Sequence, residues 1–349
     1  MQNGWATAAA AVLYAAGGFS LAMQFYMRIL NRWYAARWKH VIGRVVIFGL
    51  PLASGLGGAA AGWTPWAAVP AAALLFHIAL ERASVRARRS MRAEPPVEIG
   101  GAAPGRWITT RDLQVLRYEA PSPWPGSPRV RIAHASDLHF HDGTDAAYFR
   151  SVAAQLASAA PDLVVLTGDY VFRQPESARL RDWLAGLSAP AGIWAVLGNH
   201  DYAASPGSVR AALEAGGVRV LAGRTRRADL GGGRAVDLCG DDRPWAETRP
   251  DPLRAEPGIP LIGLSHSPDN APDFAAAGAW AVFSGHLHGG HIRLPWFGAV
   301  ALPSRHGRCF EHGRYRIGTT HLFVSAGVGS TYPAFRLRCP PDVLLVDLV

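Results

Sequence analysis

The chain changes character near residue 100, from long apolar stretches to short apolar runs separated by polar segments. One uncharged stretch covers 5–27, and residues 45–80 contain no charged side chain, with a break at 62–66. Stretches of this length suit helices that cross a bilayer. We therefore expect a membrane anchor over 1–93 with three transmembrane helices, at about 5–27, 45–62 and 64–81.

Two other interpretations of this N-terminal part are open. A cleavable signal peptide would need a basic segment before its apolar run, and none precedes Trp5. A buried helical hairpin of a soluble domain is disfavoured, because few soluble helices lack charge over such lengths.

After a linker expected at 94–106, rich in Pro, Gly and Ala, the pattern becomes that of one folded domain over 107–349. Phe149, Val152 and Leu156 share one face of a predicted helix. Short apolar runs predict buried strands at 130–135, 163–167, 193–197, 261–264, 279–283, 322–325 and 343–346. Strands that alternate with helices predict an α/β fold with a largely parallel sheet.

The net charge of +9 comes mainly from arginines that flank the apolar stretches, in 28–44 and 82–92. Under the positive-inside rule both basic segments face the cytoplasm. We therefore expect a multi-pass protein of the inner (cytoplasmic) membrane, with the domain at 107–349 on the cytoplasmic side. The rest of the chain is nearly balanced in charge, so no nucleic-acid partner is expected.

Most predicted strands are followed by side chains that can bind a metal ion. The motifs are D-x-H at 137–139, G-D at 168–169, G-N-H-D at 198–201, a lone His266 and G-H-x-H at 285–288. Because the carboxyl ends of parallel strands meet at one edge of a sheet, these side chains should lie together. Carboxylate, imidazole and amide ligands without thiolate suit Mn, Fe, Zn, Co or Ni. We expect two divalent ions, with Mn or Zn favoured. One carboxylate would bridge them, and the two ions would lie about 3.5–4 Å apart.

In this order the motifs resemble the signature of the calcineurin-like metallophosphoesterases, over roughly residues 130–349. The resemblance implies a four-layer α-β-β-α sandwich and a two-metal phosphohydrolase. At the matching positions it implies one metal bound by Asp137, His139 and His288, a second bound by Asn199, His266 and His286, and Asp169 bridging both.

The same resemblance implies catalytic roles outside the ligand set. A hydroxide that bridges the metals would attack phosphorus, and His200 would bind the phosphate or protonate the leaving oxygen. Asp201 would orient His200, although a helix cap is an equally open role for it. Asp241 and Asp242 are expected to form turns.

The later chain resembles one branch of that family, small bacterial phosphodiesterase-like proteins with N-terminal membrane segments. The shared pieces include Gly327-Val328-Gly329 and Pro333-Ala334-Phe335-Arg336. That branch usually has Gln after G-H-x-H-G-G, where this chain has His291. His291 is therefore either a substrate contact or a rim residue. Arg336 could bind a substrate phosphate or form a structural ion pair.

Together these features predict a membrane-anchored metallophosphoesterase that hydrolyses a phosphodiester or pyrophosphate. An anchor raises the local concentration of lipids, so we expect a lipid-linked substrate, similar to that of UDP-diacylglucosamine hydrolases of the same superfamily. A tethered phosphodiesterase or phosphatase that acts on soluble substrates is the alternative. A non-catalytic membrane scaffold is disfavoured, because no ligand of the signature is missing.

Overall fold

The computed structural model describes residues 2–28, 50–61, 70–73, 75–76, 78–79, 93–102, 105–124, 126–141, 143–172, 177–246, 257–300, 302–331 and 334–349. The chain divides into two units. We call Met1–Arg89 with Ala301–Cys309 the N-terminal unit, and Ser90–Val300 with Phe310–Val349 the sheet unit.

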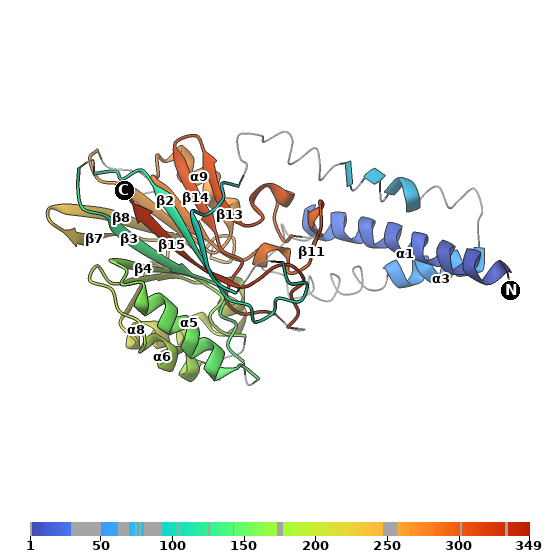
Figure 1. Cartoon of the computed structure of the whole chain (residues 1–349), viewed down its shortest axis with the longest axis horizontal. Coiled ribbons are helices and arrows are strands. Elements are labelled where there is room, and N and C mark those ends of the chain that lie inside the picture. Colours follow the sequence, from blue (N-terminus) through green and yellow to red (C-terminus); the bar gives the residue numbers. More distant parts are fainter. Residues whose placement is uncertain are drawn as a thin grey trace. The chain divides into compact units, whose positions relative to one another are not determined.

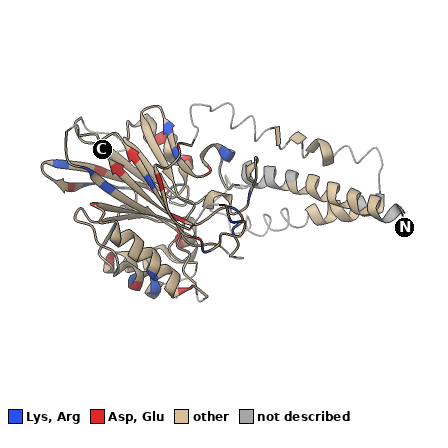
Figure 2. Ribbon diagram, in the orientation of Figure 1, with Lys and Arg blue, Asp and Glu red and all other residues tan. Residues whose placement is uncertain are grey.

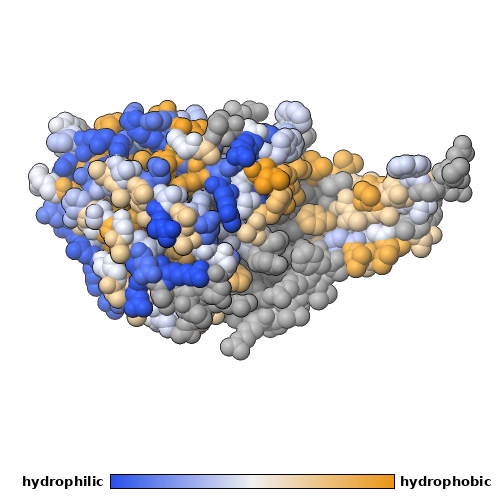
Figure 3. All heavy atoms as spheres, turned by 60° about the horizontal axis from the view of Figure 1, so that its bottom comes forward, coloured by the Kyte–Doolittle hydropathy of each residue, from blue (hydrophilic) through white to orange (hydrophobic). Residues whose placement is uncertain are grey.

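The N-terminal unit contains helices α1 (Gln2–Arg28) and α3 (Leu50–Ala61). They approach closely through small residues, since a Cβ added to Gly18 would lie 2.6 Å from Ser54 Oγ. Large apolar side chains point away from this contact, with Trp5 85% and Leu52 66% exposed. Figure 3 shows the described surface of these helices as largely apolar. In the ribbon of Figure 2 the parts of both helices that are not grey have no blue or red segment.

The helix expected at 5–27 is present as α1, and α3 lies within the range expected at 45–62. Most of 64–81 falls outside the described residues. Over the described ranges, no helix combines the length and the apolar character that a membrane crossing requires.

Two β-sheets that pack face to face form the centre of the sheet unit (Figure 1). The first has the order β1-β2-β15-β3-β4-β5-β6, with β1 Glu98–Gly101, β2 Gln114–Ala120, β15 Asp342–Leu348, β3 Val130–Ala135, β4 Leu163–Thr167, β5 Ile193–Val196 and β6 Val218–Val220. The second has the order β13-β14-β10-β9-β8-β7, with β13 Gly313–Ile317, β14 Thr320–Val324, β10 Ala281–Ser284, β9 Leu261–Ser265, β8 Arg234–Asp241 and β7 Thr225–Gly231. Neighbours from β3 to β6 are parallel, as are β8, β9, β10 and β14.

Alternation along β4 explains how the layers form, because successive side chains of a strand point to opposite faces. Val164 and Leu166 join a core with helices α5 (Ala146–Ser158), α6 (Ser177–Leu184) and α8 (Pro206–Ala215). Leu163 and Val165 join the core between the two sheets. The predicted helical face is confirmed in α5, where Phe149, Val152 and Leu156 are buried.

Helix α9 (Ala271–Ala276) covers the second sheet from outside, where the ring of Phe274 fills the space over Gly263. Ile262 and Leu264, which flank that glycine, face the other sheet. The layers are therefore α-β-β-α, as expected, although the last layer is one short helix. The remaining elements are α7 (Asn199–Ala204), the 3-10 turns Pro268–Asn270, His288–Gly290 and Gly307–Phe310, and the β11–β12 hairpin (Arg293–Leu294, Gly298–Ala299).

The expected linker at 94–106 is wrong in part, since Glu98–Gly101 forms β1. This strand pairs antiparallel with β2 at the edge of the first sheet. Its residues are mostly exposed, so they lack the apolar pattern of a buried strand. The same reason applies to β7, whose sequence TRRADLG is largely exposed.

Asp347 in the central strand β15 is buried, and it binds two arginines from the strands on either side. Arg131 Nε and Arg117 Nε each donate to its carboxylate over 2.7 Å. Burial opposes ionisation, but these hydrogen bonds outweigh it and hold the pKa of Asp347 below its usual range.

We predict that Asp347→Asn lowers the free energy of unfolding by about 2 kcal/mol at neutral pH, because both guanidinium groups lose a charged partner. The folded-state pKa is depressed, so this stabilisation is complete above the unfolded value of about 3.9 and disappears as the pH falls through the folded value. Urea unfolding across this pH range measures it. Glu119→Gln, at an exposed contact of Arg117, is the control and should cost less than about 0.5 kcal/mol. Equal losses in the two variants would contradict the prediction.

Candidate metal centre

All the candidate ligands come together where the carboxyl ends of the strands of both sheets meet. The first sheet supplies Asp137 and His139 after β3, Asp169 after β4 and Asn199 at the start of α7; the second supplies His266 after β9, and His286 and His288 after β10. Backbone hydrogen bonds join neighbouring loops. The N–H of Asp137 donates to Gly168 O over 2.9 Å, and the N–H of Gly285 donates to His266 O over 3.0 Å.

The loops hold several ligands in left-handed backbone conformations, which non-glycine residues rarely adopt. The φ angles are 55° at Asp137, 49° at His139, 56° at Asp169, 68° at His286 and 48° at His288. The chain approaches itself so closely here that a Cβ on Gly198 would lie 2.2 Å from Asp169 Oδ1. Such strain persists only where the surrounding structure enforces it, and it concentrates at functional sites.

The first ligand group consists of Asp137, His139 and His288. The Nε2 atoms of His139 and His288 lie 3.0 Å apart, and His288 Nε2 lies 3.2 Å from Asp137 Oδ1. Two ligand atoms that each bind the same ion at about 2.0–2.2 Å lie about as far from one another as these atoms do. The group is therefore arranged as ligands of a single cation.

The second ligand group consists of Asp169, His266 and His286, with Asn199 beside it. Nε2 of His266 lies 3.2 Å from Asp169 Oδ2 and 3.2 Å from Asn199 Oδ1. The same Asp169 Oδ2 lies 3.6 Å from His139 Nε2 of the first group. Asp169 thus faces both groups, as a bridging carboxylate must.

The chemistry of this donor set also fits divalent cations. His286 Nε2 is buried and has no hydrogen-bond partner, so coordination would satisfy it. Burial, and after it the neighbouring His266, lower the pKa of His286 to about 3, which leaves its ring neutral as a ligand must be. Burial also lowers the pKa of His266, but Asp169 and Asp137 outweigh it and raise the value to about 9. These carboxylates therefore favour positive charge at the position of a metal.

Asp201 is expected either to orient His200 or to cap a helix, and its hydrogen bonds in the structure are those of a cap. Its two oxygens accept hydrogen bonds from the backbone N–H groups of Asp169, Tyr170, Val171 and Gly198, over 2.8, 2.9, 3.3 and 2.9 Å. The fully buried carboxylate thus ties the loop after β4 to the start of α7. Its role is closer to the alternative, a helix cap, and extends to a second loop.

His200 lies at the open side of the first ligand group. Its ring stacks on Phe172 at a centroid distance of 5.2 Å and meets the ring of His139 edge-on at 4.7 Å. The N–H of His200 donates to Asp169 Oδ1 over 2.8 Å. Being only partly buried, the imidazole can reach a substrate held beside the ligands.

His291 and Arg336 lie on either side of His288. The ring of His291 packs against that of His288 at a centroid distance of 4.4 Å. Arg336 is fully buried, which contradicts the expected contact with a substrate phosphate. Its Nη2 donates to Ala326 O over 2.8 Å and to Gly327 O over 3.0 Å, and it lies 3.3 Å from His288 Nδ1. The guanidinium therefore holds the Gly-Val-Gly loop against a candidate ligand.

Two neighbours of the site have no signal in the sequence pattern. The ring of Trp245 meets the rings of His266 and His286, each at a centroid distance of 5.2 Å. Asp242, which was expected only to form a turn, is buried and accepts a hydrogen bond from Tyr202 OH over 3.0 Å. It supports α7, which begins at Asn199.

Comparisons with known proteins agree with this geometry. A family model described as calcineurin-like phosphoesterase matches residues 130–290. The uncharacterized metallophosphoesterase YkuE of Bacillus subtilis is 28% identical over 231 residues, 64% of this chain and 80% of that protein. Phosphodiesterase YaeI of Escherichia coli is 28% identical over 224 residues, 63% of this chain and 82% of that protein. UDP-2,3-diacylglucosamine pyrophosphatase LpxG of Chlamydia trachomatis is 29% identical over 292 residues, 66% of this chain and 87% of that protein.

The shared position of Asp169 predicts unequal effects of ligand substitutions on metal content. We expect about two ions per chain after dialysis against Mn. His288→Ala should lose one ion, whereas Asp169→Asn should lose both, because its oxygen faces both groups. Elemental analysis measures the content, and Asp229→Asn on the exposed strand β7 is the matched control. An Asp169→Asn protein that keeps both ions would contradict the bridging role.

Arg336→Lys should weaken metal binding by about tenfold, because a lysine cannot hold several carbonyls and His288 at once. Titration with Mn under equilibrium dialysis measures the affinity. Arg338→Lys, an exposed neighbour, is the control and should bind like the wild type. Equal affinities of the two variants would show that Arg336 does not support the ligand.

Proposed function

Since residues 130–290 form a calcineurin-like phosphoesterase domain, and the chain is thus a metal-dependent phosphoester hydrolase, we propose that it cleaves a phosphodiester or pyrophosphate bond in a lipid-linked substrate. The observation that carries this proposal is the position of Asp169 Oδ2 between two ligand groups. When bound there, two divalent ions would supply an activated water and stabilise the charge that develops on the phosphate oxygens.

The side chains of the protein complete the chemistry. His200 is placed at the edge of the first ligand group to hydrogen-bond a phosphate oxygen or to donate a proton to the leaving oxygen. The stacking on Phe172 holds its ring in one orientation. Trp245 packs on the two imidazoles of the second group and restricts the access of water to that side.

A substrate with two groups on phosphorus is favoured by a second feature. A cavity of about 100 Å³ opens beside His139, and its walls include Thr110, Arg111 and Ser330. It offers hydrogen-bond donors to the group on the far side of the scissile bond. The activities in the names of YaeI and LpxG, a phosphodiesterase and a pyrophosphatase, are consistent with such a substrate.

The lipid linkage and the membrane location are the finer parts of the proposal. They are supported by the lipid substrate in the name of LpxG, by the outward-facing apolar side chains of α1 and α3, and by the flanking arginines. In this proposal the N-terminal unit anchors the enzyme in the inner membrane and the active site faces the cytoplasm.

A tethered enzyme for soluble phosphodiesters is the second candidate. The observation that favours it is the small size of the cavity beside His139, about 100 Å³, which accommodates a headgroup and no acyl chain. The two candidates differ in whether acyl chains improve catalysis. A diacyl sugar pyrophosphate in mixed micelles should be cleaved with at least about tenfold higher kcat/KM than its deacylated form if the first is correct.

We predict that the full-length protein with Mn hydrolyses bis-p-nitrophenyl phosphate, and that His200→Asn lowers kcat by about 10²–10⁴-fold. The metal content of this variant should stay at the wild-type value, since His200 is outside both proposed ligand sets. Asp229→Asn, on the exposed strand β7, is the control with near wild-type kcat. A wild-type protein that binds Mn but leaves the diester intact would refute the proposed activity.

A further inference from the structure

An exposed apolar surface lies beside the candidate metal centre. Three segments meet here, because Ile108 forms an antiparallel bridge with Leu337 and Ile292 forms a parallel bridge with the same residue. We define the outer face as Ile108, Ile292, Leu294, Trp296, Phe335 and Leu337. Four of these side chains are 62%, 39%, 43% and 40% exposed, at Ile108, Ile292, Leu294 and Phe335, so their apolar area faces solvent.

A single backbone segment separates the outer face from the candidate ligands. Leu337 N–H donates to His291 O over 2.8 Å, and Arg293 N–H donates to Leu337 O over 3.0 Å. Between Phe335 and Leu337, Arg336 points inward to His288. The segment that supports a candidate ligand on its inner side therefore presents apolar side chains on its outer side.

Trp296 forms the tip of this face, in the turn between β11 and β12. Its side chain is fully exposed, and its φ of 60° is left-handed. The strained backbone holds the largely apolar indole in water, where its exposure is unfavourable. Such strain and exposure are typical of positions that meet a partner. A tryptophan side chain suits the interface of a bilayer, because its ring is amphipathic and this region is partly apolar and partly hydrated.

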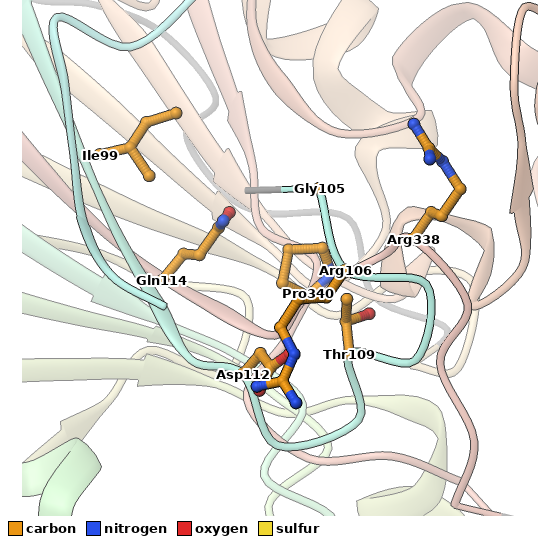
Figure 4. Close-up of a pocket in the computed structure, with 8 residues that line it drawn as sticks. All are labelled: Ile99, Gly105, Arg106, Thr109, Asp112, Gln114, Arg338 and Pro340. Atoms are coloured by element: carbon orange, nitrogen blue, oxygen red, sulfur yellow. The ribbon is translucent and has the colours of Figure 1, made fainter. Parts of the chain in front are cut away.

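Arginines border the same face around a cavity of about 210 Å³ (Figure 4). Arg106 and Arg338 line this cavity together with Thr109, Gln114 and Asp112. The side chain of Arg106 is 67% exposed and pairs with Asp112, whereas the Arg338 guanidinium lies over the ring of Trp107 at 5.2 Å. Asp112 offsets Arg106 within the cavity, whereas the Arg338 guanidinium points away from the other lining residues (Figure 4). Arg338 thus adds positive charge at the border of the outer face, which complements a lipid phosphate.

We propose that the outer face docks on the surface of an anionic phospholipid bilayer, with Trp296 at the interface and the arginine-lined cavity on lipid headgroups. Docking would bring lipid-linked phosphoesters to the ligand groups, and in this respect the inference rests on the proposed function. Exposed Trp, Phe, Leu and Ile beside Arg are the composition of surfaces that lie in the bilayer interface.

The test places an environment-sensitive fluorophore at Trp296. The variant Trp296→Cys is labelled with NBD in the full-length protein, whose native cysteines are buried. Vesicles contain phosphatidylcholine alone or with phosphatidylglycerol. We expect a blue shift and a rise in NBD emission with the anionic vesicles. Gly232→Cys is the matched site, because it lies in the β7–β8 turn and β7 is at the opposite end of the sheet unit from β11 (Figure 1).

The proposal is overturned by an unchanged emission at position 296, or by an equal change at position 232. A shift that appears without vesicles and grows with protein concentration would assign the face to a second copy of the chain, and would also overturn it. Arg338→Gln in the labelled protein should raise the half-saturating concentration of anionic vesicles by about fivefold, and Arg226→Gln on β7 should leave it unchanged. Emission does not depend on turnover, so failure of the docking surface is distinguished from failure of the proposed hydrolysis.

Discussion

The carboxylate of Asp201 is the contact on which the geometry of the site depends. It is fully buried, and a buried carboxylate is costly unless donors surround it. The protein supplies four backbone N–H groups, and all of them belong to the loop after β4 or to the entry of α7. This carboxyl group therefore does more than cap a helix. It fixes the distance between Asp169 and Asn199, which follow two different strands.

A second constraint comes from the packing of the two sheets. Each ligand group takes members from both sheets, since His288 joins Asp137 in one and His266 joins Asp169 in the other. The spacing of the groups is consequently set by the core between the sheets, where Val165 packs in the same cluster as Phe283. This explains how strained loops keep their shape. A rigid interior holds both ends of each loop, and the loops need little stability of their own.

The sequence predicts those parts of the molecule that leave a pattern in it. The buried strands β3 and β4 have the expected bounds, because most of their side chains are apolar and turn residues follow them. The candidate ligands are also recoverable, since metal-binding side chains recur at strand ends. The structure brings them together, and their coordination of metal stays a prediction. The edge strand β1 leaves no such pattern, because it is mostly exposed.

The role of Arg336, and the contact of Asp201 with the loop after β4, escape prediction for a different reason. Their partners are backbone carbonyls and N–H groups, which every residue has, so no sequence pattern marks them.

The position of β15 has a consequence for the order in which the protein is made. This strand comes after every other described strand along the chain, yet it lies in the middle of the first sheet, between β2 and β3. Its Asp342 also accepts hydrogen bonds from Ser325 Oγ and Ala326 N–H, next to the Gly-Val-Gly loop. Until residues 342–348 have left the ribosome, β2 and β3 have no strand to join them and that loop lacks its hydrogen bonds to Asp342. The nascent chain therefore carries every candidate ligand before it can hold them in place, so completion of the sheet and assembly of the metal centre are one late event.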